Sequence, residues 1–150
     1  MFEYDDLEKI DFEDMSLGRY RGLYTTTYNR FAFRIPDSEE SIRISRSPKL
    51  GRDNGLNFWL AAELQDDWSD REEYFKPYII EADFTKISED KFNSMVRSQC
   101  SELIAQPSLP LNTGEFVGAY AMYTLDRELI VDLYAEYTDE YIHFIWESTA

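Results

Sequence analysis

The C-terminal third of the chain carries its most regular pattern of hydrophobic and polar positions. From Leu129 to Tyr137 apolar side chains occupy every second position, and the segments 116–124 and 141–146 are rich in aromatic and small residues. A period of two is typical of β-strands, and the Thr-Asp-Glu sequence at 138–140 suits a turn. We therefore predict an antiparallel β-meander in this part of the chain.

A helix is predicted ahead of the meander. Ser88 is a suitable N-cap, because its hydroxyl can accept a hydrogen bond from a backbone amide of the first turn. Apolar residues then recur at helical spacing from Phe92 to Ile104, and Pro107 follows. A helix near 88–105 that packs on a mostly antiparallel sheet gives an α+β fold in a single domain over residues 1–150.

The other segments carry shorter signals. Strands are predicted over 20–27, 31–35, 42–45 and 78–84, with a turn at 28–30, a loop at 47–55 and a short helix over 70–75 that ends before Pro77. The apolar run 56–64 suits a strand in its first half and a helix in its second half, so its type stays open. The acidic N-terminal segment 1–15 is expected to be a short helix or a frayed terminus.

Composition points to a folded, strongly acidic domain. Hydrophobic residues make up 43% of the 150 positions, which argues against a disordered chain. The 30 Asp and Glu residues exceed the 15 Lys and Arg residues and give a net charge of -15. Such a field repels nucleic acid and anionic membranes and speeds association with basic proteins, so direct nucleic-acid binding is disfavoured.

The location expected from the sequence is the cytoplasm. Cys100 is the single cysteine, so no disulfide can form within the chain, as is usual in a reducing compartment. The first residues lack the basic and apolar regions of a signal peptide, and no apolar run approaches the roughly 18 residues that span a bilayer.

Two acidic clusters interleaved with aromatic residues are the candidate partner-binding surfaces. The first cluster consists of Asp66, Asp67, Trp68, Asp70, Glu72 and Glu73, and the second of Asp132, Glu136, Asp139 and Glu140. Carboxylates around aromatic side chains are a suitable composition for gripping a basic protein. The alternative is that each cluster is a solvated face above a few core aromatic residues.

A basic segment offers a different candidate surface. Residues 19–52 contain eight Lys and Arg residues against three Asp and Glu residues, a local net charge of +5. Arginine suits phosphate, and interleaved aromatic residues suit base stacking, so this segment is a candidate site for RNA or a phosphorylated ligand. The competing explanation is that these bases pair with acids elsewhere on the same molecule.

The sequence contains no recognisable catalytic motif. A phosphate-binding glycine loop, a G-x-S-x-G sequence and an H-E-x-x-H sequence are all missing. His143 is the only histidine and lies in an apolar run, so we expect it to be structural, as we do Cys100. With one histidine and one cysteine, no metal site and no cofactor are predicted, and an enzyme with a carboxylate site is the least supported class.

In general character the whole chain resembles bacterial toxin-immunity proteins, which are small, acidic and without catalytic motifs. The resemblance implies an inhibitory binding protein that neutralises a basic partner, such as a toxin nuclease domain, through an acidic, aromatic-rich surface. One alternative is a nucleic-acid mimic that inhibits a DNA- or RNA-binding protein, as phage anti-defence proteins do. The other is a module that binds RNA or a phosphate ligand through residues 19–52.

Overall fold

The computed structural model describes residues 1–14, 16–51, 53–65, 72–124 and 128–149. For residues 72 and 73 it describes the backbone alone. Within these ranges six strands form one antiparallel sheet in the order β1-β2-β6-β5-β4-β3. The strands are β1 (Tyr24–Tyr28), β2 (Glu40–Pro48), β3 (Asp83–Ile87), β4 (Phe116–Tyr123), β5 (Ile130–Tyr137) and β6 (Glu140–Ser148). The α-helices are α1 (Tyr4–Glu8), α2 (Leu56–Glu63), α3 (Glu72–Ile80) and α4 (Glu89–Cys100), and the 3-10 helices are η1 (Arg30–Ala32) and η2 (Pro36–Ser38).

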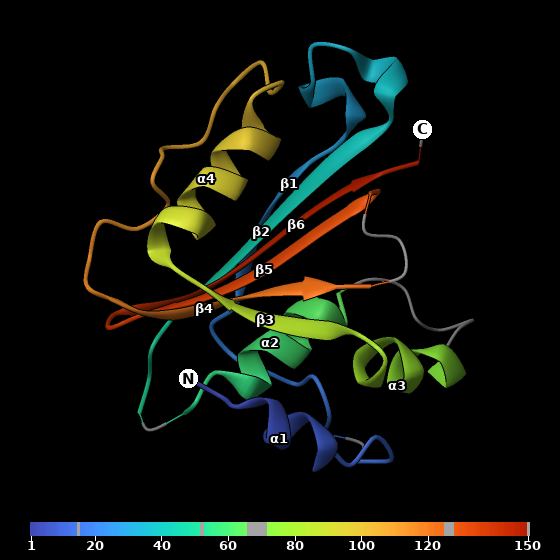
Figure 1. Cartoon of the computed structure of the whole chain (residues 1–150), viewed down its shortest axis with the longest axis vertical. Coiled ribbons are helices and arrows are strands. Elements are labelled where there is room, and N and C mark those ends of the chain that lie inside the picture. Colours follow the sequence, from blue (N-terminus) through green and yellow to red (C-terminus); the bar gives the residue numbers. More distant parts are fainter. Residues whose placement is uncertain (15, 52, 66–71, 125–127, 150) are drawn as a thin grey trace.

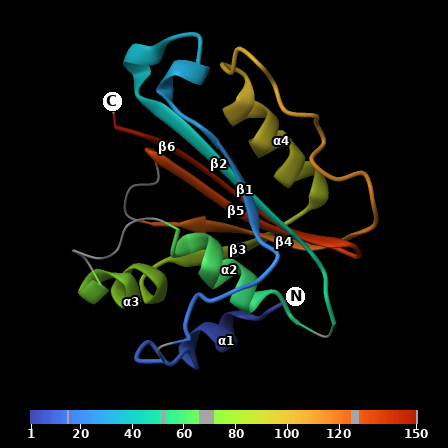
Figure 2. The ribbon, with the colours of Figure 1, turned by 180° about the vertical axis from the view of Figure 1, so that it is seen from behind.

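The sheet lies between two helical layers. Helix α4 covers one face, whereas α1, α2 and α3 lie against the other face (Figures 1 and 2). Strands β4, β5 and β6 follow one another in sequence and pair as neighbours, which confirms the predicted meander. The α+β fold with a helix packed on an antiparallel sheet is therefore confirmed.

Polar side chains form hydrogen bonds with backbone groups at both ends of helix α4. The Ser88 hydroxyl accepts a 3.1 Å hydrogen bond from the Lys91 amide, as its N-cap position predicted. The helix ends at Cys100, five residues before the predicted end, because the side-chain amide of Gln106 donates to the carbonyls of Cys100 and Leu103 at 2.7 and 3.2 Å. The buried face of the helix (Phe92, Val96 and Cys100) packs on the sheet.

Cys100 lies fully buried in this core, and its burial raises the pKa of the thiol to about 11. A thiol reacts as the thiolate, so both access and ionisation are suppressed in the folded protein. We expect the native protein to be inert to a disulfide reagent at pH 8 and to react at one equivalent after unfolding in urea. Rapid labelling of the native protein would contradict this packing.

The opposite face of the sheet carries a core rich in aromatic side chains. Phe2, Trp59, Tyr120 and Tyr134 are at most 3% exposed, and the ring of Phe2 lies 5.0 to 5.8 Å from each of the other three rings. The run 56–64, whose type the sequence left open, forms α2. This helix is buried from Phe58 to Glu63, and an α-helix with apolar residues on all sides is typical of a core position.

Two predicted elements are wrong. The segment 31–35 is not a strand, because the Asn29 side chain accepts a 3.0 Å hydrogen bond from the Phe31 amide and starts the 3-10 helix η1. Helix α3 continues through Pro77 to Ile80, and β3 begins only at Asp83, which places residues 78–80 in the helix rather than in a strand. Phe75 and Ile79, four residues apart on this helix, both contribute to the core.

Candidate functional site

The first acidic cluster predicted from the sequence lies largely outside the described residues, whereas the second is mostly buried. Residues 66–70 of the first cluster lie outside the described residues, as do the side chains of Glu72 and Glu73. In the second cluster Asp132, Glu136 and Glu140 are only 1, 2 and 8% exposed, and Asp139 alone is exposed. The expectation of a solvent-facing acidic surface at residues 132–140 is therefore wrong.

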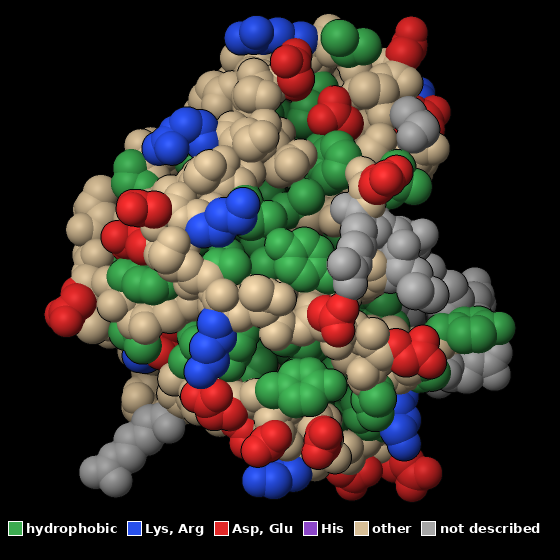
Figure 3. All heavy atoms as spheres, in the orientation of Figure 1, with side chains coloured by type: hydrophobic (Ala, Val, Ile, Leu, Met, Phe, Trp, Pro, Cys, Tyr) green, Lys and Arg blue, Asp and Glu red, His purple; other side chains and the backbone are tan. Residues whose placement is uncertain are grey.

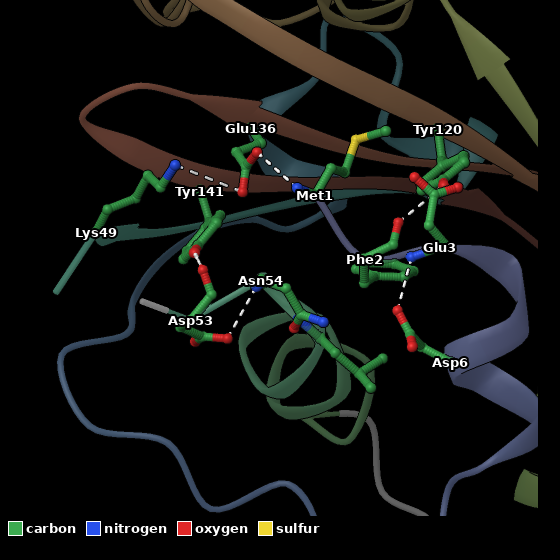
Figure 4. Close-up of polar contacts among 12 residues, drawn as sticks. Met1, Phe2, Glu3, Asp6, Lys49, Asp53, Asn54, Tyr120, Glu136 and Tyr141 are labelled. Atoms are coloured by element: carbon green, nitrogen blue, oxygen red, sulfur yellow. Dashed lines mark hydrogen bonds and ion pairs between the residues drawn. The ribbon is translucent and has the colours of Figure 1, made fainter. Parts of the chain in front are cut away.

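The buried carboxylates of this second cluster have cationic partners. Glu140 is paired with Arg46 and accepts a 2.8 Å hydrogen bond from Asn112. Glu136 lies 3.1 Å from the α-amino nitrogen of Met1 and 3.6 Å from the Lys49 ammonium, as Figure 4 shows. Buried charge is retained where it is paired, so these groups stabilise the fold and are turned away from any external partner.

A further buried cluster is formed by Glu63, Asp132 and His143. It shares Asp132 with the second acidic cluster. The Nε2 atom of His143 lies 2.8 Å from Glu63 Oε1 and 3.0 Å from Asp132 Oδ1. The register of the sheet pairs His143 with Tyr134 and Asp132 with Ile145, which makes Asp132 and His143 diagonal neighbours on one face. Glu63, the last residue of α2, reaches the same point from the helical layer.

All three side chains are removed from solvent, with exposed fractions of 0, 1 and 0% for Glu63, Asp132 and His143. Burial, reinforced by the negative charge of Asp132, raises the pKa of Glu63 to about 8. Burial alone would lower the pKa of His143, but the two carboxylates outweigh it and raise this pKa to about 10. The cluster therefore has a strongly negative potential at Nε2, which attracts a proton or another cation.

The hydrogen bonds of this cluster are concentrated on one of the two ring nitrogens of His143. His143 Nδ1 and Asp132 Oδ2 are buried without a hydrogen-bond partner among the described residues, while both carboxylates converge on Nε2. The three ligand atoms lie within 4.8 Å of one another and could hold a metal ion. The sequence did contain a signal for this cluster, because each residue is a polar group within an apolar run and so needs a buried partner.

A pocket of about 310 Å³ opens beside this buried cluster. Its lining includes Arg43, Gln65 and Ile145. Ile145 lies two residues from His143 and so projects from the same face of β6, whereas Gln65 follows Glu63 by two residues at the end of α2. The pocket is thus lined by same-face neighbours of the cluster residues, such as Ile145 two positions after His143, and not by the cluster residues themselves.

One group of exposed carboxylates lies around α1, at the lower edge of Figure 3, while other acidic side chains are spread over the left and upper parts of the view. We define the α1 acidic surface by the exposed side chains of Glu3, Asp5, Glu8, Asp11, Glu13, Asp14, Glu81 and Asp83. Residues 1–14, α3 and β3 are held together here by ring contacts of Phe12 with Phe75 and of Tyr4 with Phe84, and by the pair of Glu3 with Lys86. The sequence showed that residues 1–15 are acidic, but it did not show that this segment packs against α3 and β3.

A second pocket, of about 450 Å³, lies within the α1 acidic surface. It is lined by Tyr4, Asp83, Phe84, Thr85 and Tyr123. Among the described strands β3 pairs only with β4, so its other edge presents backbone donors and acceptors beside the pocket. An aromatic pocket with one carboxylate, Asp83, thus lies at an edge strand and against Tyr4 of the acidic segment 1–14.

The basic segment 19–52 does not form one surface in the described structure. Arg43 and Arg46 project from opposite faces of β2, since they are three residues apart on one strand. Arg43 donates to the Ala62 carbonyl at 3.3 Å, and Arg46 donates to Glu140 and to the Leu111 carbonyl. These contacts match the explanation that bases in this segment pair within the molecule.

A scan against protein-family models and searches of curated proteins and of solved structures found no significant match. Among the described residues no helix is long and apolar enough to cross a membrane.

Proposed function

We propose that this protein binds a basic protein through the α1 acidic surface and inhibits it by covering its functional face. One observation carries the proposal: an aromatic pocket on β3, an edge strand among the described strands, includes Asp83 and Tyr4, and Tyr4 belongs to the segment 1–14, which presents six exposed carboxylates. Exposed charge steers a partner of opposite sign, while a pocket with Tyr4 and Phe84 offers apolar area for a hot-spot contact.

The balance of charge on this surface favours a cationic partner. Against its eight carboxylates stand Lys9, Lys76 and Lys86, of which Lys86 is paired with Glu3 and Lys76 lies over the Phe12 ring. An arginine or lysine of the partner could place its aliphatic stem against Tyr4 and its charge near Asp83. A partner strand could also add by backbone hydrogen bonds to the edge of β3 that is paired with no other described strand.

The partner class that we propose to test first is a basic toxin domain, such as a nuclease with a positively charged substrate channel. The likeness of the chain to immunity proteins supports this choice, as does its net charge of -15. We assign the encounter to the cytoplasm, because the only thiol is a free, buried cysteine, which suits a reducing compartment.

The test starts from capture of partners from the source lysate at low salt, followed by titration of the purified partner. Replacing Asp5, Glu8 and Glu13 by Asn, Gln and Gln removes three exposed charges of the α1 acidic surface. We expect affinity to fall about tenfold and its salt dependence to flatten, because several peripheral ion pairs are lost together. Inhibition of the partner's activity should weaken in parallel.

A matched control changes the net charge equally at a distance from this surface. Asp37, Glu102 and Glu115 are exposed and lie outside the α1 acidic surface. Replacing these three by Asn, Gln and Gln should leave affinity within about twofold. Equal losses in both triple variants would show that only net charge matters and would overturn the assignment of the surface.

A further inference from the structure

We propose that Glu63, Asp132 and His143 form a binding site for one divalent transition-metal ion, of the class from Mn²⁺ to Zn²⁺. The site is distinct from the α1 acidic surface and does not depend on the proposed function. Its three ligand atoms come from α2, β5 and β6, so a bound ion would tie the helical layer to the centre of the sheet.

The geometry of the three ligand atoms suits such an ion. A six-coordinate ion with bonds of about 2.1 Å separates neighbouring ligands by about 3 Å, and a tetrahedral zinc ion separates them by about 3.4 Å. The distances from His143 Nε2 to the two carboxylate oxygens, 2.8 and 3.0 Å, fall close to the first of these values. Asp132 Oδ2, for which the described residues offer no hydrogen-bond partner, would be available as a fourth ligand atom.

A pure hydrogen-bond network explains this arrangement less well. Two carboxylates that served an imidazolium would be expected at its two nitrogens, one at each. Here both converge on Nε2, while Nδ1 is buried and has no partner in the part of the chain that the structure describes. In an imidazolium that orphan N–H is a charged donor, whereas in a metal-bound imidazole it is neutral and its burial is less unfavourable.

The ligand types select the class of ion. One imidazole nitrogen with two carboxylates is a mixed nitrogen and oxygen set, which favours Mn²⁺, Fe²⁺, Co²⁺ or Zn²⁺ over Ca²⁺, because Ca²⁺ prefers oxygen ligands alone. A divalent ion with a neutral imidazole also balances the charge of two carboxylates.

The test uses Zn²⁺ alone, added to the full chain after dialysis against a chelator. We expect calorimetry to show one tight site per chain. Glu63→Gln and Asp132→Asn should each weaken this binding about tenfold or more. Glu140→Gln serves as the matched control, because this carboxylate is also nearly buried but pairs with Arg46 outside the cluster, and it should bind Zn²⁺ like the unchanged protein.

A second measurement needs no substitution. His143 is the only histidine, so its two imidazole ¹⁵N signals are unambiguous. One equivalent of Zn²⁺ should shift the Nε2 signal to the value of a metal-bound nitrogen and leave Nδ1 protonated. An unchanged Nε2 signal, or several weak sites that persist in Glu63→Gln and Asp132→Asn, would overturn the proposal and assign the binding to surface carboxylates.

Discussion

Replacing His143 with leucine is expected to lower the free energy of unfolding of the metal-free protein by about 3–5 kcal/mol. Leucine fills a similar volume but leaves Glu63 and Asp132 facing each other without the imidazole that lies 2.8 and 3.0 Å from them. Both carboxylates are at most 1% exposed, so water cannot replace the lost partner. Urea unfolding in the presence of a chelator measures the change.

A second substitution separates this electrostatic effect from a change in packing. Adding Glu63→Gln to His143→Leu removes a buried carboxyl group that would otherwise have to stay protonated or form a second charge beside Asp132, so the double variant should recover about 1–2 kcal/mol relative to His143→Leu alone. If the two substitutions instead destabilised additively, the interaction between Glu63 and His143 would not be the reason for the loss.

Replacing Gly55 with alanine is expected to destabilise the fold by about 3 kcal/mol, from backbone strain and overpacking together. Gly55 precedes α2 with a φ of 86°, and its amide donates a 2.9 Å hydrogen bond to the Asp53 side chain. A Cβ atom at this position would lie 2.0 Å from the hydroxyl oxygen of Tyr134, a residue that is 1% exposed and has no room to move. Thermal unfolding monitored by circular dichroism measures the loss.

Gly51 provides a matched control for this substitution. Its φ of 84° is nearly the same, but apart from its chain neighbours no heavy atom of the described residues lies within 4 Å of an added Cβ. Gly51→Ala should therefore show only the backbone component, about 1 kcal/mol. Equal effects at both glycines would contradict the close approach of α2 to Tyr134.

Parts of the fold that depend on local pattern were predictable from the sequence. The alternation from Leu129 to Tyr137 predicted β5, and Ser88 with the apolar positions that follow predicted α4, because both signals arise from neighbours in the chain. The two errors came from contacts that pattern does not encode. Asn29 bonds the Phe31 amide and bends 31–35 into η1, while core contacts of Phe75 and Ile79 accompany a helix that continues through Pro77.

The sequence by itself determined the excess of acids, the lone histidine and the meander, since these follow from composition and from a period of two. Only the tertiary structure decided which carboxylates face solvent. Alternating apolar and polar positions usually indicate a sheet with one face exposed to solvent. Here α1, α2 and α3 cover the face opposite α4, so both faces are covered. Asp132 and Glu136 are therefore buried, and Glu63, 80 residues from His143, meets it because α2 packs on β6.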